Sequence, residues 1–298
     1  MKSNTKLVLG LVAVVVAVGI LLGMGVAGRL GNGEVVEAAT QRLMAEDSWH
    51  VKAELVLHLP ERLRGKQRPF TEVKAKIEGD VVKNDEGARE LTGTLAGEAK
   101  GRGNIFFADG DIRLLEDAVA FRLENLPVLL NPSGSLTRRW TYVDRPVLAV
   151  NNSDDIAGGL RAAVAGLREV GEESVEGRRS RHYQGSLTQE QEESLYEMLR
   201  QRSSGSLAWH QLARLLQSND ARSLDVWVDE KNKTIARIKI DFTRPLSDGR
   251  RFDFATLDLV FSDYGKEVVI DRPEKELTAR PDAFANLFGT GEIAAVEN

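Results

Sequence analysis

LDVWVDEKNKTIARIKI, residues 224–240, is the stretch that decides the fold of this chain. Apolar side chains occupy every second position on both sides of the polar residues 231–233. This period of two is typical of half-buried antiparallel strands that are joined by a turn. Residues 257–261 repeat the pattern in a third strand, and residues 268–270 are predicted to form a short fourth strand. The C-terminal third of the chain is therefore expected to be sheet.

The N-terminal half shows the same alternation after one helix. Residues 34–47 place their apolar side chains on one helical face, and residues 49–59 alternate as a long half-buried strand. Further strands are predicted at residues 70–82, 90–99, 104–108, 112–116, 119–123 and 136–143. The pair Asp109-Gly110 favours a two-residue hairpin turn between two of them. This half is expected to be an antiparallel meander.

Helical patterns return in the middle of the chain. Apolar residues recur at helical spacing over residues 156–170, after the capping pair Thr188 and Gln191, and over residues 207–216. Residues 180–187 are predicted as an isolated strand, and residues 282–288 as a final helix. No break in composition divides the chain after residue 33. The order of elements predicts one α+β domain, a curved antiparallel sheet with helices packed on its concave face.

Residues 7–28 form an uncharged apolar stretch of 22 residues. At about 1.5 Å per residue it spans about 33 Å, enough for a hydrocarbon core of about 30 Å. Lys2 and Lys6 precede it, which favours a single-pass signal anchor in the cytoplasmic membrane. Residues 1–6 would then be a cytoplasmic tail, and residues 29–298 an extracytoplasmic domain. The alternative is a signal peptide that is cleaved near residues 25–27.

Composition and motifs exclude several classes of function. The chain has no cysteine, so disulfides, cysteine-ligated zinc and thiol nucleophiles are absent. Its net charge of −5 argues against nucleic acid as a partner. His50 and His58 would lie about 26 Å apart on one strand, too far to share a metal. No cofactor, metal site or catalytic motif is expected, and the chain is predicted not to be an enzyme. A hydrolase that uses converging carboxylates stays a remote alternative.

Several of these segments resemble a known family. Residues 224–228, 235–240 and 257–273 resemble the C-terminal hairpins of LppX/LprG-type lipoproteins, which belong to the LolA/LolB-like group. Residues 173–187 resemble a strand pair of that family, and Gly177, His182, Tyr183 and Gly185 match its pattern. The resemblance implies a half-open β-barrel that is plugged by helices, with an apolar cavity for acyl chains. Members carry or sense lipids or lipidated proteins in the cell envelope. This chain lacks the lipidated cysteine, and a transmembrane anchor would replace it.

These inferences lead to one functional prediction and one alternative. The prediction is a membrane-anchored extracytoplasmic protein that binds a lipid or another apolar ligand and acts in envelope lipid or lipoprotein handling or sensing. Its cavity would be lined by apolar residues at alternate positions of the strands: Leu55, Leu57, Ile77, Phe121, Val226, Ile238, Leu259 and Phe261. In the alternative, the same residues form a filled core, and the domain is a signalling module or binds an envelope protein.

Overall fold

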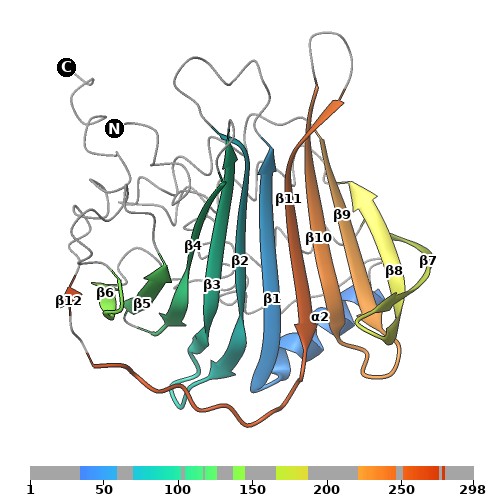
Figure 1. Cartoon of the computed structure of the whole chain (residues 1–298). Helices are drawn as coiled ribbons and strands as arrows, with labels where there is room; N and C mark the ends of the chain where they lie inside the picture. Colours follow the sequence, from blue (N-terminus) through green and yellow to red (C-terminus); the bar gives the residue numbers. More distant parts are fainter. Residues whose placement is uncertain are drawn as a thin grey trace, which may run out of the picture.

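A large antiparallel sheet and one helix make up the described part of the chain (Figure 1). The computed structural model describes residues 34–58, 70–101, 105–116, 118–125, 137–144, 166–186, 221–245, 251–274 and 277–278. The helix is α2 (Glu34–Ala45). The strands are β1 (Ser48–His58), β2 (Phe70–Lys83), β3 (Arg89–Gly101), β4 (Ile105–Leu114), β5 (Ala118–Asn125), β6 (Thr141–Asp144), β7 (Arg168–Val175), β8 (Arg178–Ser186), β9 (Ala221–Asp229), β10 (Ile235–Pro245), β11 (Arg251–Ser262) and β12 (Leu277–Thr278).

The order of the strands places β1 at the centre of the sheet. The order is β12-β6-β5-β4-β3-β2-β1-β11-β10-β9-β8-β7, and the pairs are antiparallel except β12 with β6. One half of the sheet is therefore the N-terminal meander, and the other half runs from β11 back to β7. The two halves join where β1 pairs with β11, with Ala53 opposite Leu259. The predicted curved antiparallel sheet is confirmed.

Alternation along the strands gives the sheet two different faces. The inner face carries the apolar residues and packs against α2, through Val36, Ala39 and Leu43 of the helix. The outer face carries charged residues in cross-strand pairs, such as Lys76 with Glu54, 3.0 Å apart. Since the pleat has a period of two, neighbouring residues of one strand lie on opposite faces.

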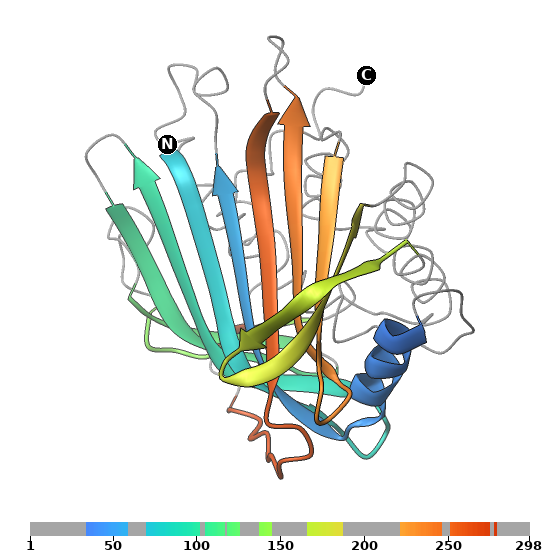
Figure 2. The same cartoon turned by 90° about the vertical axis from the view of Figure 1, so that its right-hand side faces the viewer.

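Close glycine contacts accompany the bend of the sheet. Gly79 of β2 lies opposite Gly93 of β3. A Cβ atom at Gly79 would lie 2.3 Å from the carbonyl oxygen of Thr92 and 2.7 Å from the Cα atom of Gly93. Only glycine permits this approach of the two backbones. Figure 2 shows that the lower ends of the central strands bend toward the side on which α2 lies.

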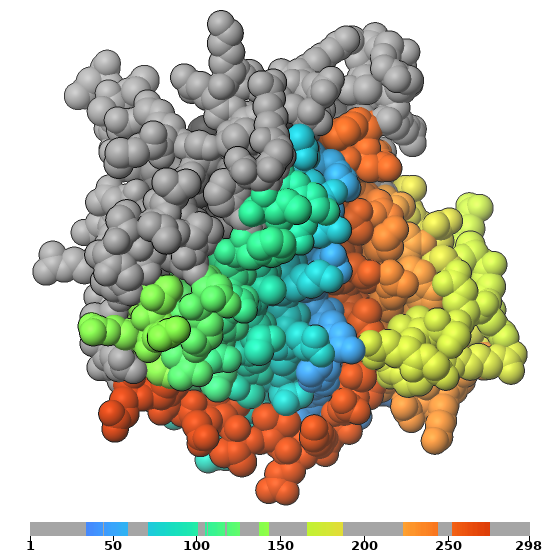
Figure 3. Space-filling model, viewed as in Figure 1, coloured from blue at the N-terminus to red at the C-terminus, as the bar shows by residue number. Residues whose placement is uncertain are grey.

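The β7–β8 hairpin folds across the outer face. Its turn uses Glu176 and Gly177, both at positive φ, of 47° and 79°. From this turn Glu176 reaches Lys52 of β1, 2.8 Å away, although three strands separate β8 from β1 in the sheet. Val175, Trp227 and Ala236 form a small apolar cluster on the outer face. Figure 3 shows the hairpin in yellow, laid over the neighbouring strands toward β1 in blue.

Two predictions in the strand assignment are wrong for local reasons. Asp109-Gly110 is not a turn, because β4 runs through it without interruption and the register with β5 shifts there. A Cβ atom at Gly110 would lie 2.1 Å from the carbonyl oxygen of Arg122, so this glycine permits close strand packing. Residues 180–187 are not isolated, since β8 pairs with both β7 and β9, as the family resemblance implies.

Three element boundaries also differ from the prediction. The helix expected over residues 156–170 cannot reach residue 170, because β7 begins at Arg168 and Val170 is exposed in it. The strand expected over residues 136–143 is shorter, as Arg138 at a φ of 61° precedes β6. Residues 268–270 are not a strand: Val269 is exposed, and Ile270 packs against the cluster around Trp140.

The remaining predicted helices lie outside the described residues. These are the anchor at residues 7–28, the N-terminal part of the helix at residues 156–170, the two helices after Thr188 and Ser206, and the final helix at residues 282–288. Within the described ranges, no helix has the length and apolar character needed to cross a membrane.

Candidate ligand site

The eight predicted lining residues come together on the inner face of the sheet. They belong to six strands, β1, β2, β5, β9, β10 and β11, and all are members of one hydrophobic cluster. Four of them share a row across the sheet: Val226 lies opposite Ile238, Ile238 opposite Leu259, and the row continues through Ala53 to Ile77. The alternation of the sequence therefore predicted that these residues share one face of the sheet. Ligand binding by these residues stays a prediction.

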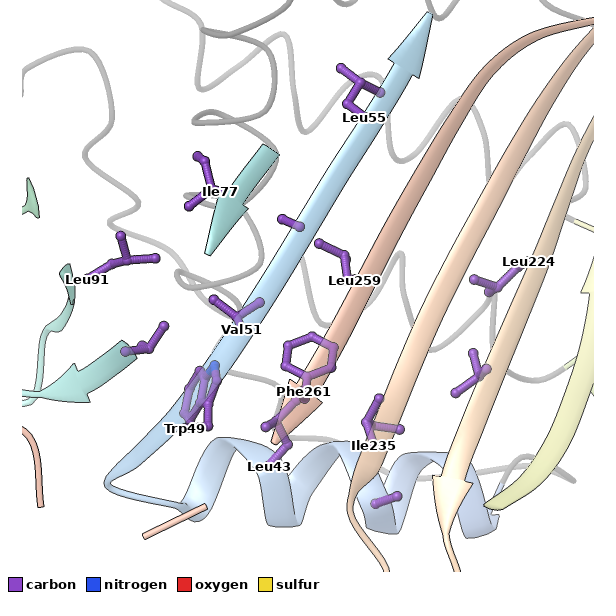
Figure 4. Close-up of a cluster of buried hydrophobic side chains, with 14 of the residues drawn as sticks. Leu43, Trp49, Val51, Leu55, Ile77, Leu91, Leu224, Ile235, Leu259 and Phe261 are labelled. Atoms are coloured by element: carbon purple, nitrogen blue, oxygen red, sulfur yellow. The ribbon is translucent and has the colours of Figure 1, made fainter. Parts of the chain in front are cut away.

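Burial along this face is uneven. Near α2 the side chains are closed off: Trp49, Ile235 and Phe261 are at most 4% exposed. Figure 4 shows Leu43 of the helix next to Phe261 at this end, and Leu55 and Leu224 farther along their strands. The helix therefore closes one end of the apolar face.

On β1, β10 and β11, four aliphatic side chains farther from α2 are only partly buried. They are Leu57, Ile238, Ile240 and Leu257, and the name half-buried patch is used for them below. Ile240 lies opposite Leu257 in the sheet, and Leu257 lies opposite Leu55, so the patch is continuous over β10, β11 and β1. Of the predicted residues, Leu57 and Ile238 belong to this patch. Ile77, Val226, Leu259 and Phe261 are closed core, at 1–4% exposure.

One polar group lies among these apolar residues. Tyr183 of β8 lies opposite Val226 and is 7% exposed; its hydroxyl meets the geometric criterion for a hydrogen bond with none of the described residues, although the side chains of Glu169 and Arg181 lie near it. Burial raises the pKa of Tyr183, so the phenol stays neutral and can donate one hydrogen bond. The sequence pointed to Tyr183 only as part of the family pattern. Its place at the end of the Val226 row gives the inner face one hydrogen-bonding position, of the kind that orients a ligand in an apolar site.

The charged residues of the outer face are engaged with one another. The hydrogen bond from Lys100, 3.0 Å away, lowers the pKa of Glu72. His182 lies between two carboxylates, with Nε2 2.8 Å from Asp225 and Nδ1 3.2 Å from Glu173, and its ring stacks on Trp227. His182 therefore packs on Trp227 and forms a hydrogen bond on the outer face. In the ranges that the structure describes, no group of three or more side chains is arranged to hold a metal ion.

Comparisons with known proteins return structural matches only. No family model matches the sequence, and no curated protein matches it. The lipoprotein LppX of Mycobacterium tuberculosis is 14% identical, with 80% of this chain and 97% of that chain covered and a TM-score of 0.42. LprF from Mycobacterium bovis is 13% identical, with 81% and 96% covered and the same TM-score of 0.42. The chain is therefore similar to these two solved structures over about four fifths of its length.

Proposed function

We propose that this chain is an extracytoplasmic binding protein that holds a lipid or another apolar ligand against the inner face of its sheet. The observation that carries the proposal is the half-buried patch, where large aliphatic side chains remain partly accessible on an apolar face whose α2 end is closed. Residues 7–28 would anchor the chain in the cytoplasmic membrane. The protein would act in lipid or lipoprotein handling, or in lipid sensing, without catalysing a reaction.

The physical basis for binding is removal of apolar surface from water. Each buried methylene contributes about 0.8 kcal/mol, so roughly ten methylenes against the patch contribute about 8 kcal/mol before the cost of ordering the chain. An ester or acid group of the ligand would accept a hydrogen bond from the Tyr183 hydroxyl, which forms no hydrogen bond of normal geometry with the described residues. The family resemblance of residues 173–187 and 224–273 supports the same class of ligand.

A second candidate function rests on the closed part of the cluster. Ile77 and Leu259 are each 1% exposed, which is the burial of an ordinary core. If a partner protein rather than an acyl chain covers the half-buried patch, the domain is an interaction module of the same fold. The two candidates differ in whether a lipid accompanies the protein.

Adjacent residues of β1 supply a matched pair of variants for the test. Leu57→Glu places a carboxylate in the half-buried patch, whereas Val56→Glu places it one residue away on the outer face. The full chain and both variants would be purified in one detergent, and the lipids extracted from each would be quantified by mass spectrometry. The Val56→Glu variant controls for added charge and for lipid held by the membrane anchor.

The proposal predicts about one acyl ligand per chain in the unsubstituted protein and in Val56→Glu. Leu57→Glu is expected to lose most of this ligand. Circular dichroism would establish that both variants are folded. Equal amounts of lipid in the two variants, or no lipid that survives purification, would refute lipid binding by the half-buried patch. Either result would favour the interaction module.

A further inference from the structure

The described domain begins close to the proposed membrane anchor. The anchor is residues 7–28 and α2 starts at Glu34, so only residues 29–33 separate the two. Five residues span at most about 18 Å, even when they are fully extended. An anchor at residues 7–28 would therefore hold the start of α2 within about 18 Å of the membrane that contains it.

α2 lies across the end of the sheet at which β1 begins. Only two residues separate the helix from β1. Figure 4 shows Leu43 of the helix next to Phe261, near the end of β11. A short tether to α2 therefore turns this end of the sheet toward the membrane. The opposite end of β1, at His58, lies nine residues beyond Trp49, or about 30 Å farther along the strand.

The side of α2 that faces away from the sheet combines an apolar side chain with a cation. Val35 is 47% exposed, and Arg42 is exposed two helical turns later on the same side. Of the two acidic residues of the helix, Glu37 is buried, and Glu34 lies in the first turn, where the helix dipole favours a carboxylate. No described element covers this side of the helix.

The turn between β9 and β10 adds two further cations beside α2. Lys231 and Lys233 are exposed in this turn, and neither forms an ion pair with a residue that the structure describes. Arg42 is also without an ion pair in the described ranges, and it donates to the carbonyl oxygen of Asn232 at 3.5 Å, which places the turn beside the helix. The neighbouring Glu230 is engaged elsewhere, 3.1 Å from an arginine of β8. The name basic cluster is used below for Arg42, Lys231 and Lys233.

We propose, on the basis of the anchor but not of the ligand in the proposed function, that the α2 end of the domain docks on anionic lipid headgroups of the membrane that holds the anchor. The basic cluster would lie at the headgroup phosphates, and Val35 would enter the apolar boundary beneath them. Each lysine or arginine near an anionic membrane surface strengthens such a contact about fivefold. Docking in this orientation directs the half-buried patch away from the membrane, since Leu57 lies near the far end of β1.

A single labelled position can report this contact, because the sequence has no cysteine. The full chain with Ala38→Cys, on the exposed side of α2, or with Ile105→Cys, at the opposite end of the sheet, would be labelled with a fluorophore and reconstituted into vesicles. Ile105 is 53% exposed and lies in the cross-strand row that ends at His58. The vesicles would contain equal amounts of phosphatidylcholine and phosphatidylglycerol, and a lipid with a nitroxide on its headgroup would quench a fluorophore at the membrane surface.

The two labels should give different results. The label at Ala38→Cys should be quenched in these vesicles and much less in vesicles of phosphatidylcholine alone. The label at Ile105→Cys should stay unquenched in both. High salt should reduce the quenching at Ala38→Cys, because it screens the attraction between exposed charges and the headgroups.

Two double variants, each made in the Ala38→Cys chain, test the basic cluster. Lys231→Gln with Lys233→Asn removes two of its charges, and asparagine tolerates the positive φ of 57° at residue 233. This pair should lower the ratio of docked to undocked protein about 25-fold, as two factors of about five. Lys74→Gln with Lys76→Gln removes the same charge from the outer face of β2 and should leave the quenching unchanged. Circular dichroism would establish that both double variants are folded.

An alkaline carbonate wash separates failure of the docking from failure of the anchor. Release of the protein from the vesicles would refute the anchor, and the docking with it, but not lipid binding by the half-buried patch. In protein that stays in the vesicles, an unquenched label at Ala38→Cys, or equal quenching of the two labels, would overturn the docking alone. Equal quenching with and without phosphatidylglycerol, or in the two double variants, would overturn it as well, because the basic cluster would then not hold the surface.

Discussion

Leu257 and Leu259 offer the sharpest test of how the inner face is divided. They are the same residue type, two positions apart on β11 and on the same face, but Leu259 is 1% exposed and Leu257 is only partly buried. Leu→Ala removes three carbon atoms, worth about 2.4 kcal/mol of transfer free energy at a fully buried site, and a cavity adds to this loss. Leu259→Ala should therefore lower the free energy of unfolding by about 3 kcal/mol. Leu257→Ala should lower it by about 1 kcal/mol, since part of its side chain is already in water.

The variant that loses less stability, Leu257→Ala, should lose more of the bound ligand. Leu257 belongs to the half-buried patch, so its truncation should reduce the acyl ligand that accompanies the protein, whereas Leu259→Ala should keep it. Urea denaturation followed by circular dichroism gives the stability difference, provided that the slope of the transition is unchanged. Lipid extraction from the same preparations gives the ligand content.

Equal losses of stability in the two variants would refute this reasoning. They would mean that the inner face is packed uniformly and that the partial exposure of Leu257 does not mark a ligand surface. Loss of the ligand in Leu259→Ala alone would place the site at the α2 end instead.

Three further predictions concern the sheet and the hairpin. Gly79→Ala should destabilise the fold by about 1 to 3 kcal/mol in urea denaturation, because its methyl group would meet the backbone of β3, whereas Gly166→Ala meets nothing within 4 Å and should be neutral. The contact with Lys52 lowers the pKa of Glu176 below its ordinary value of 4.5, so its contribution is present above that pH and is lost as the pH falls through the folded-state pKa. Glu176→Gln should therefore reduce the loss of unfolding free energy between neutral and acid pH. An unchanged pH dependence would show that the contact with Lys52 does not contribute to stability. Burial raises the pKa of Tyr264 from 10.0 to about 12, so the folded state should lose stability as the pH rises from about 10 to about 12, and Tyr264→Phe should remove this loss in thermal melts at alkaline pH.

The strands of the sheet could be predicted wherever one face is buried and the other is exposed to solvent. Residues 224–240 show this best, because a period of two has no other common explanation in a folded chain. Where both faces of a strand have the same surroundings, the signal vanishes. β7 is exposed at every position except Val175, so the helical pattern that was predicted to end at Val170 overlaps the first three residues of the strand.

The error at Asp109-Gly110 has a different origin. The dipeptide favours a tight turn locally, but a glycine inside a strand equally permits a neighbouring backbone to approach. Which of the two holds depends on Arg122 and Leu123 of β5, since their backbone atoms occupy the space that a Cβ atom at Gly110 would need. Such a tertiary contact is invisible to any pattern that is read along one segment.

The candidate site shows the same limit. Alternation predicted which face Leu57, Val226 and Leu259 share, because the pleat fixes the face. It could not rank their burial, since burial depends on where α2 crosses the sheet.

The residues that carry the family resemblance are structural, and this explains why they predict the fold better than the function. Gly177 permits the positive φ of the β7–β8 turn, His182 stacks on Trp227, and a Cβ atom at Gly185 would meet Leu167 at 2.9 Å. Each acts in forming the hairpin and seating it beside β9, and none contacts the half-buried patch. Tyr183 is the exception, since its hydroxyl lies beside the Val226 row and forms no hydrogen bond of normal geometry with the described residues. If Tyr183 serves only to form the hairpin, Tyr183→Phe should leave the lipid content unchanged. If Tyr183 orients a ligand, the same variant should lose ligand with little loss of stability, because it removes only the phenol oxygen.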